Sequence, residues 1–160
     1  MNNLIIYYTK GETTKETVNR LISKLGKENT DVLNIQKKKE CDLSKYDRVI
    51  FGSGVYGGNI PIEIKQFLQK NIEELNKKQI IIFLHALGSE DKYKAIVNNG
   101  YSVLGQKDYM LFYLGGKSDL SKQNFFIKFL MRKLAKSKNL DINNPNNIRE
   151  EEIERLIEMI

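Results

Sequence analysis

Residues 79–85 read Gln-Ile-Ile-Ile-Phe-Leu-His and contain the longest apolar run of the chain, Ile80 to Leu84. A short, continuous run of aliphatic and aromatic residues is typical of a strand in a parallel sheet that is covered on both faces. It is far shorter than the ~20 apolar residues that a membrane-spanning helix needs. We therefore predict a buried strand over 79–85, followed by a helix over about 91–98.

Outward from this run, similar short runs alternate with stretches that have helical periodicity. The predicted strands cover residues 4–8, 31–35, 48–53, 79–85 and 109–114. Apolar residues three and four positions apart predict helices after Thr13, after Pro61, over 91–98, over 121–137 and over 149–159. Five strands that alternate with helices predict an α/β fold with a doubly wound parallel sheet between two helical layers. Without repeats or a linker, we expect one domain over 1–160.

Local signals mark the ends of the first two helices. Thr13 and Glu16 have the spacing of a capping box, and Gly26 supplies a stop signal thirteen positions after Thr13. Pro61 suits the first turn of the second helix, because its missing N–H is not needed there.

Composition excludes several classes of site. The chain has one cysteine, Cys41, and one histidine, His85, so we expect no internal disulfide and no metal site. We expect no signal peptide before the first strand, and a cytoplasmic protein that can lie peripherally at the inner face of the membrane. The net charge of +6 is compatible with nucleic acid, an anionic membrane or an acidic partner, and also with simple genome bias.

In doubly wound sheets, ligands bind beyond the carboxyl ends of the strands. The first loop there is Thr9, Lys10, Gly11, Glu12, Thr13 and Thr14. Free backbone N–H groups and the positive end of a helix dipole make such a loop an anion site, and threonine hydroxyls add donors. The chain lacks the Gly-x-x-x-x-Gly-Lys-Ser/Thr pattern, so hydrolysis of nucleoside triphosphates is not expected. Helix capping alone is the other interpretation of these threonines.

The second loop is Gly54, Val55, Tyr56, Gly57, Gly58 and Asn59. With Gly52 it spells Gly-x-Gly-x-x-Gly, but it follows a later strand and its helix begins only after Pro61, so we do not expect a dinucleotide site. An aromatic residue beside glycines suits a flat ring system. The peptide between Gly57 and Gly58 has the freedom to flip. A glycine-rich turn with a core tyrosine is the alternative.

These loops resemble those of the flavodoxins, which bind flavin mononucleotide (FMN). The resemblance implies the strand order 2-1-3-4-5, with the FMN phosphate on Thr9–Thr14, the ring on Gly54–Asn59 and Tyr56 stacked against it. It places His85, Ala86, Leu87 and Gly88 on the third FMN loop. That loop lacks the acidic and aromatic residues common in the family, so one face of the ring is expected to be open to a substrate.

Within this family, Tyr113-Leu114-Gly115-Gly116-Lys117 and the helix after it resemble the branch of quinone-linked protoporphyrinogen oxidases and small bacterial flavodoxins. Residues 117–138 hold seven Lys/Arg and one acid, Asp119, together with several Phe, Leu and Met residues. This composition suits contact with a membrane surface or a hydrophobic partner, a substrate channel, or a core helix with a solvated basic face. Nucleic acid is not expected.

Three functions follow. The first is an FMN protein that carries electrons to a redox partner, with a nearby positive field that favours the anionic reduced flavin. The second is a dehydrogenase of a porphyrin-type substrate with a quinone acceptor. The third is a flavin-free interaction module. A phosphoacceptor receiver domain is excluded, since Tyr7-Tyr8-Thr9 and Ser53 stand where it needs acidic residues. No side chain is nominated as catalytic.

Overall fold

The computed structural model describes residues 1–88, 90–118, 120, 124–137 and 139–160. Five strands form one sheet: β1 (Asn3–Tyr8), β2 (Thr30–Asn34), β3 (Arg48–Gly54), β4 (Gln79–His85) and β5 (Tyr109–Tyr113). The order is β2-β1-β3-β4-β5 and every pairing is parallel. This confirms the predicted doubly wound fold and its strand order.

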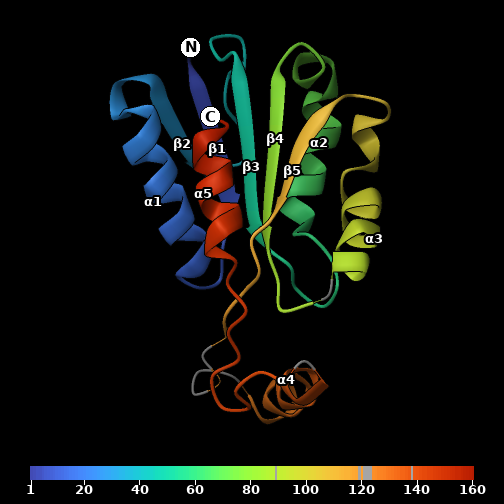
Figure 1. The fold of residues 1–160 in the computed structure, drawn as a ribbon. Helices are drawn as coiled ribbons and strands as arrows, with labels where there is room; N and C mark the ends of the chain where they lie inside the picture. The colour runs from blue at the N-terminus through green and yellow to red at the C-terminus, as the bar shows by residue number, and fades with distance from the viewer. Residues whose placement is uncertain (89, 119, 121–123, 138) are drawn as a thin grey trace.

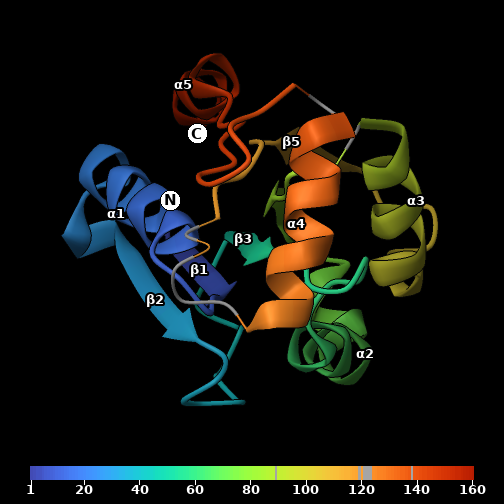
Figure 2. The same ribbon diagram turned by 90° about the horizontal axis from the view of Figure 1, so that it is seen from below.

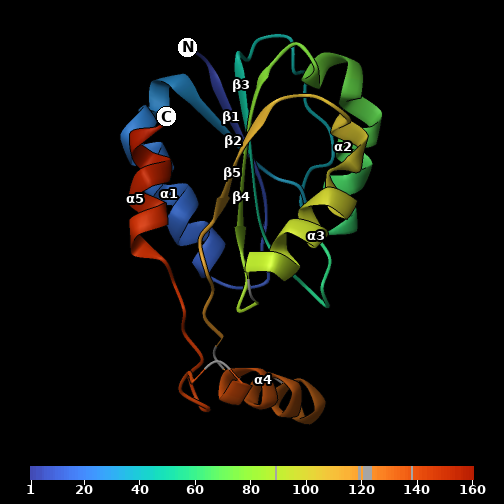
Figure 3. The same cartoon turned by 45° about the vertical axis from the view of Figure 1, so that its right-hand side comes forward.

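Three helices lie between strands: α1 (Thr13–Leu25), α2 (Ile62–Leu75) and α3 (Glu90–Gly100). Two more, α4 (Phe125–Ser137) and α5 (Glu150–Glu158), follow β5. Short 3₁₀ turns cover Lys27–Asn29 and Ser102–Leu104. Figure 1 and Figure 3 show α1 and α5 on one face of the sheet and α2 and α3 on the other. Helix α4 lies outside both layers.

The two faces of the sheet hold two apolar clusters. Successive side chains of a strand point to opposite faces, so Leu4 and Ile6 pack with α2 and α3 while Ile5 packs with α1 and α5. In β4, Ile82 and Phe83 divide in the same way. Both faces are therefore covered, which is why the strands read as continuous apolar runs rather than alternating ones.

The ends of the first two helices differ in part from the prediction. The N-cap of α1 is Glu12, and no side chain caps the helix there. Thr13 is already helical, and Glu16 pairs with Lys117 at 2.8 Å. The predicted capping box of Thr13 and Glu16 is therefore wrong, because a capping box needs non-helical backbone at the threonine. Gly26 ends α1 as predicted, with φ +84°.

The second helix begins at Ile62 with Pro61 as its N-cap, one position before the predicted place in the first turn. The predicted helix over 121–137 is described from Phe125, and its positions 121–123 lie outside the described residues.

Helix α4 belongs to an excursion of the chain between β5 and α5. The two ends of the excursion run side by side: Ser118 donates its N–H to the carbonyl of Pro145 at 3.0 Å, and Asn147 donates to that of Gly116 at 2.9 Å. A further bond joins the N–H of Arg149 to the carbonyl of Leu114 at 3.0 Å. We call these two paired segments, 114–118 and 145–149, the stalk. Figure 1 shows that the stalk carries α4 beyond the carboxyl ends of the strands.

Candidate functional site

The three loops predicted to form the site lie together at the carboxyl edge of the sheet. They follow β1, β3 and β4, which are neighbours in the sheet. Figure 2 shows this edge from below, with α4 on the same side of the molecule. The backbone N–H of Lys10 donates to the Tyr56 hydroxyl at 2.9 Å, and that of Val55 donates to the His85 carbonyl at 2.9 Å. These bonds join the first loop to the second, and the second to the third.

The first loop turns tightly before α1. The Thr9 hydroxyl donates to the carbonyl of Gly11 at 2.6 Å and accepts from its N–H at 3.1 Å. Thr13 is half-buried and Thr14 is buried at the start of the helix. The first turn of a helix leaves backbone N–H groups without partners in the helix, and its dipole favours an anion. The loop therefore has the donors that a phosphate needs.

The second loop is a two-residue turn. Tyr56 and Asn59 exchange both backbone hydrogen bonds, at 2.9 and 3.1 Å, across Gly57 and Gly58. Both glycines have positive φ, +57° and +77°, as in a type I′ turn. Only glycine adopts this backbone at little cost, and the turn is exposed.

The remaining glycines of the Gly-x-Gly-x-x-Gly pattern have packing reasons. A Cβ on Gly52 would lie 2.1 Å from the ring of Phe83, and one on Gly54 would lie 2.8 Å from the Tyr56 hydroxyl. The pattern thus results from close packing and a tight turn, which supports the exclusion of a dinucleotide fingerprint.

Tyr56 connects the first two loops. Its ring lies 5.6 Å from that of Tyr8, edge to face, and the ammonium of Lys10 lies 5.0 Å from its centroid. Burial raises the pKa of the Tyr56 hydroxyl above its usual value, so the group stays protonated at neutral pH. It therefore accepts the bond from Lys10 as a neutral phenol.

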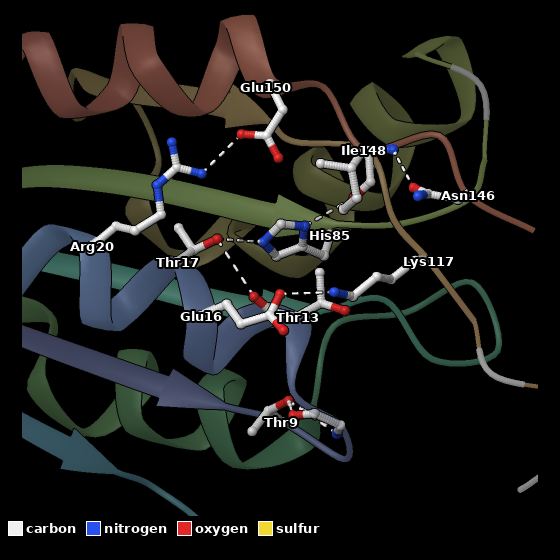
Figure 4. Close-up of polar contacts among 12 residues, drawn as sticks. Thr9, Thr13, Glu16, Thr17, Arg20, His85, Lys117, Asn146, Ile148 and Glu150 are labelled. Carbon is white, nitrogen blue, oxygen red and sulfur yellow. Dashed lines mark hydrogen bonds and ion pairs between the residues drawn. The ribbon is translucent and has the colours of Figure 1, made fainter.

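In the third loop, the side chain of His85 turns toward α1 and away from the second loop. Its Nδ1 lies 3.0 Å from the carbonyl oxygen of Gly115, which only accepts, so Nδ1 carries the proton. Its Nε2 lies 2.9 Å from the Thr17 hydroxyl, which donates to it. Burial lowers the pKa of His85 to about 4, and the ring is neutral at pH 7. Figure 4 shows His85 and Thr17 pointing toward each other.

Residues that the sequence analysis did not nominate hold the third loop in place. The Tyr113 hydroxyl lies 2.8 Å from the carbonyl oxygen of Ala86 and also contacts that of Gly88. The N–H of Ala86 donates to Gly115 at 2.9 Å. Leu87 is buried. The position of the loop is therefore set by bonds to its own backbone groups.

A cavity of about 130 Å³ lies between α1 and α5, beside His85 and Thr13. Its charged side chains are paired. Arg20 contacts Glu150 at 2.9 Å and also Glu154, and Lys117 contacts Glu16. Thr13 lines this cavity and also belongs to the first loop, so the two adjoin each other. Figure 4 shows the residues around it.

The part of the chain that the structure describes contains neither a cluster of metal ligands nor a membrane-spanning helix. Its His, Cys, Asp and Glu residues form no group of three or more that could hold a metal ion. None of its helices is long and apolar enough to cross a bilayer.

The residues at the carboxyl edge fit FMN. The first loop offers N–H groups and hydroxyls at a helix start, which match a phosphate. The second loop offers an aromatic ring, an exposed turn and the Asn59 amide, which donates to the Gly57 carbonyl at 3.2 Å. Anion donors thus lie beside an aromatic surface, joined by the bond between Lys10 and Tyr56.

Comparison with known proteins agrees with this geometry. Residues 4–143 match the family model described as a flavodoxin domain. An uncharacterized protein of Methanocaldococcus jannaschii is 27% identical over 152 residues, which cover 82% of this chain and 99% of that protein. Protoporphyrinogen IX dehydrogenase [quinone] of Escherichia coli K12 is 32% identical over 79 residues, which are 48% of this chain and 43% of that enzyme.

Among solved structures, a flavoprotein from Lactobacillus acidophilus NCFM in complex with FMN is similar, with a TM-score of 0.51 and 16% identity. The match covers 76% of this chain and 95% of that one. At this level of identity the likeness shows that the two chains share a fold.

Proposed function

This chain belongs to the flavodoxin domain family, and from that premise we propose that it binds FMN and transfers electrons through it. The observation that carries the proposal is the hydrogen bond from the Lys10 N–H to the Tyr56 hydroxyl at 2.9 Å. It holds the loop with the anion donors directly beside the loop with the aromatic residue and the glycine turn. A phosphorylated flat ring requires both loops, the first for its phosphate and the second for its ring.

In this proposal, the backbone N–H groups at the start of α1 and the hydroxyls of Thr9, Thr13 and Thr14 hold the phosphate. Tyr56 packs against the ring, and the turn of Gly57 and Gly58 borders its edge. The backbone of 85–88 completes the site. Bound FMN supplies chemistry in which one or two electrons are accepted and passed on.

The turn of the second loop contributes more than contact. Because Gly57 and Gly58 both have positive φ, the peptide between them can turn over at little cost. Its carbonyl can then accept a hydrogen bond from a flavin nitrogen that carries a proton, and its N–H can donate to a flavin nitrogen that carries none. The same peptide thereby serves both redox states of the ring.

The E. coli relative supports a second, more specific function, which is dehydrogenation of a porphyrin-type substrate with a quinone acceptor. The alignment spans less than half of either protein, and it is the observation that favours this candidate. The exposed turn at Gly57–Gly58 gives such a substrate a way to approach the ring. Electron transfer to a redox partner protein is the broader alternative.

The first test is flavin binding. We expect the purified protein to be yellow, or to become yellow with added FMN, and to bind FMN roughly tenfold or more tightly than riboflavin, because charge-assisted bonds to the phosphate add about 1.4 kcal/mol. Thr13→Val removes one hydroxyl, and we expect it to reduce the ratio of the affinity for FMN to the affinity for riboflavin. Colourless protein that takes up no FMN contradicts the proposal and favours a flavin-free interaction module.

The second test separates the two redox functions. FMN-loaded protein is assayed for oxidation of protoporphyrinogen IX with menaquinone, and in parallel for reduction by a ferredoxin reductase. Turnover with the porphyrin and quinone supports the dehydrogenase. Reduction by the reductase without porphyrin turnover supports the electron shuttle.

A further inference from the structure

The phenylalanines of this chain divide into two groups. Four of the seven lie in the core, each at most 3% exposed: Phe51, Phe67, Phe83 and Phe112. The other three all lie in α4, where Phe125 is 86% exposed, Phe126 67% and Phe129 59%. Leu130 beside them is 44% exposed. Exposed large aromatic side chains gathered on one helix mark an interaction surface.

The exposed side of α4 also carries cations. At 100° per residue, Phe125 and Phe129 lie on one row, and Arg132 and Lys136 continue it toward the C-terminus. Lys133 is exposed on the same side. The helix contains no acidic residue. The outward surface is therefore aromatic in its first half and basic in its second.

The opposite side of α4 faces the protein. Ala135 is its buried residue, and Ile127, Met131 and Leu134 are half-buried. One stripe of the helix thus packs inward, while the exposed aromatic residues are additional to it. On a helix whose outward side only contacts water, polar residues would stand where these phenylalanines stand.

The stalk determines where this surface is presented. Figure 1 and Figure 3 show α4 beyond the carboxyl edge of the sheet, apart from the four helices that cover the sheet. Bonds from Ser118 to Pro145, from Asn147 to Gly116 and from Arg149 to Leu114 join the two segments along the stalk. The helix is therefore the outermost part of the molecule at the end where the three loops lie.

We propose that the exposed side of α4 binds the surface of a bilayer that contains anionic lipids. Phe125, Phe126 and Phe129 enter the boundary between headgroups and acyl chains, and the basic second half lies at the lipid phosphates. Aromatic and basic residues combined on one helix face suit this interface, where apolar and anionic groups lie within a few ångströms.

Charge decides against two other occupants. A second copy of α4 would bring cations against cations, without an acidic residue in either helix to offset them. A soluble anion would neutralise Arg132 and Lys136 and leave the phenylalanines in water. A lipid surface satisfies both halves of the helix. This proposal goes beyond flavin chemistry, and its test does not depend on FMN.

The test is sedimentation of the full chain with large unilamellar vesicles, either pure phosphatidylcholine or with about one third phosphatidylglycerol. We expect binding to the anionic vesicles to be roughly tenfold or more stronger than to the neutral ones, and to weaken at about 0.5 M NaCl. The triple variant Phe125→Ser, Phe126→Ser and Phe129→Ser and the double variant Arg132→Gln and Lys136→Gln each lose roughly tenfold in binding.

A matched control replaces Ile62, which is 59% exposed in α2, by serine. It should bind vesicles like the unchanged protein. Far-ultraviolet circular dichroism and urea denaturation verify that every variant folds. Three outcomes overturn the proposal: no binding to anionic vesicles, equal binding by the triple variant, or a dimer in light scattering that the triple variant converts to a monomer. The last would assign the surface to a second copy.

Discussion

The Nε2 atom of His85, at the carboxyl end of β4, lies 2.9 Å from the hydroxyl oxygen of Thr17 in α1, 68 residues earlier in the chain. On its other side, the ring donates from Nδ1 to the Gly115 carbonyl at the base of the stalk. A single neutral side chain therefore joins the helix of the first loop, the strand before the third loop and the start of the excursion.

This arrangement makes stability depend on pH. Burial lowers the pKa of His85 from 6.5 to about 4. Between pH 4 and pH 6.5, His85 is therefore protonated in the unfolded chain and neutral in the folded chain. The stabilising contribution is complete above pH 6.5 and is lost as the pH falls toward 4. From pH 7 to pH 5 we expect the free energy of unfolding to decrease by about 2 kcal/mol from this group. Urea denaturation measures it.

His85→Gln keeps a hydrogen-bonding side chain without a titrating ring and is the matched variant. Its overall stability is lower, but its decrease between pH 7 and pH 5 should be smaller by about 2 kcal/mol. An identical pH dependence in both proteins would show that His85 is not the group responsible.

Tyr56 has two separable roles. Tyr56→Phe keeps the ring and removes the bond from Lys10, and we expect the dissociation constant for FMN to rise about threefold. Tyr56→Leu also removes the aromatic surface, and the constant should rise by roughly tenfold or more. Quenching of FMN fluorescence measures both. Equal effects of the two substitutions would assign the whole contribution to the hydroxyl.

The glycines of the site differ in what they require. Gly57 has φ +57° and open space around it, so Gly57→Ala should cost about 1 kcal/mol through backbone strain alone. Gly88 also has open space, but its φ lies outside the positive range. Gly88→Ala should be neutral or slightly stabilising, because it restricts the unfolded chain. Urea denaturation of both flavin-free variants compares them. A larger loss at Gly88 would contradict this account.

In the proposed site, Lys10 brings a positive charge close to the flavin, because its ammonium lies 5.0 Å from the centroid of the Tyr56 ring. Within the described residues it has no carboxylate partner, unlike Lys15, which pairs with Glu12. If the separation between this charge and the flavin ring is taken as about 8 Å, their interaction in water contributes about 0.5 kcal/mol. This corresponds to a change of roughly 20 mV in a one-electron reduction potential. Lys10→Gln should therefore make the last reduction potential of bound FMN more negative by roughly 20 mV.

The control for this charge is Lys24→Gln, in the last turn of α1 and more than a Debye length of about 10 Å from the first loop. Its potential should equal that of the unchanged protein in a spectroelectrochemical titration. A shift of the same size in both variants would indicate an effect of net charge rather than of position.

The sheet and the helices could be predicted because burial on both faces leaves a strong record in the sequence. Ile80 to Leu84 are all apolar since each contacts one of two helical layers. The start of α1 was less accessible: Thr13 and Glu16 have capping-box spacing, but Glu16 pairs instead with Lys117, which is 101 residues away. Long-range ion pairs leave no local pattern.

The same limit applies to the site. The sequence placed His85 in the third loop but did not show which way its ring points. Strand alternation contains that information, because Leu84 packs toward α2 and α3 and the next residue must face α1. The roles of Tyr113 and Gly115 in holding the loop depend on contacts across the fold, and no spacing signals them.

The stalk has a consequence for how this protein evolves. One segment continues from the end of β5, the other leads into α5, and the two are joined to each other by backbone hydrogen bonds. The residues between them are attached to the fold through the stalk, so the excursion can gain, lose or replace residues while β5 and α5 keep their neighbours. We expect proteins related to this one to differ in length and composition there first, and to adapt to new surroundings without altering the sheet.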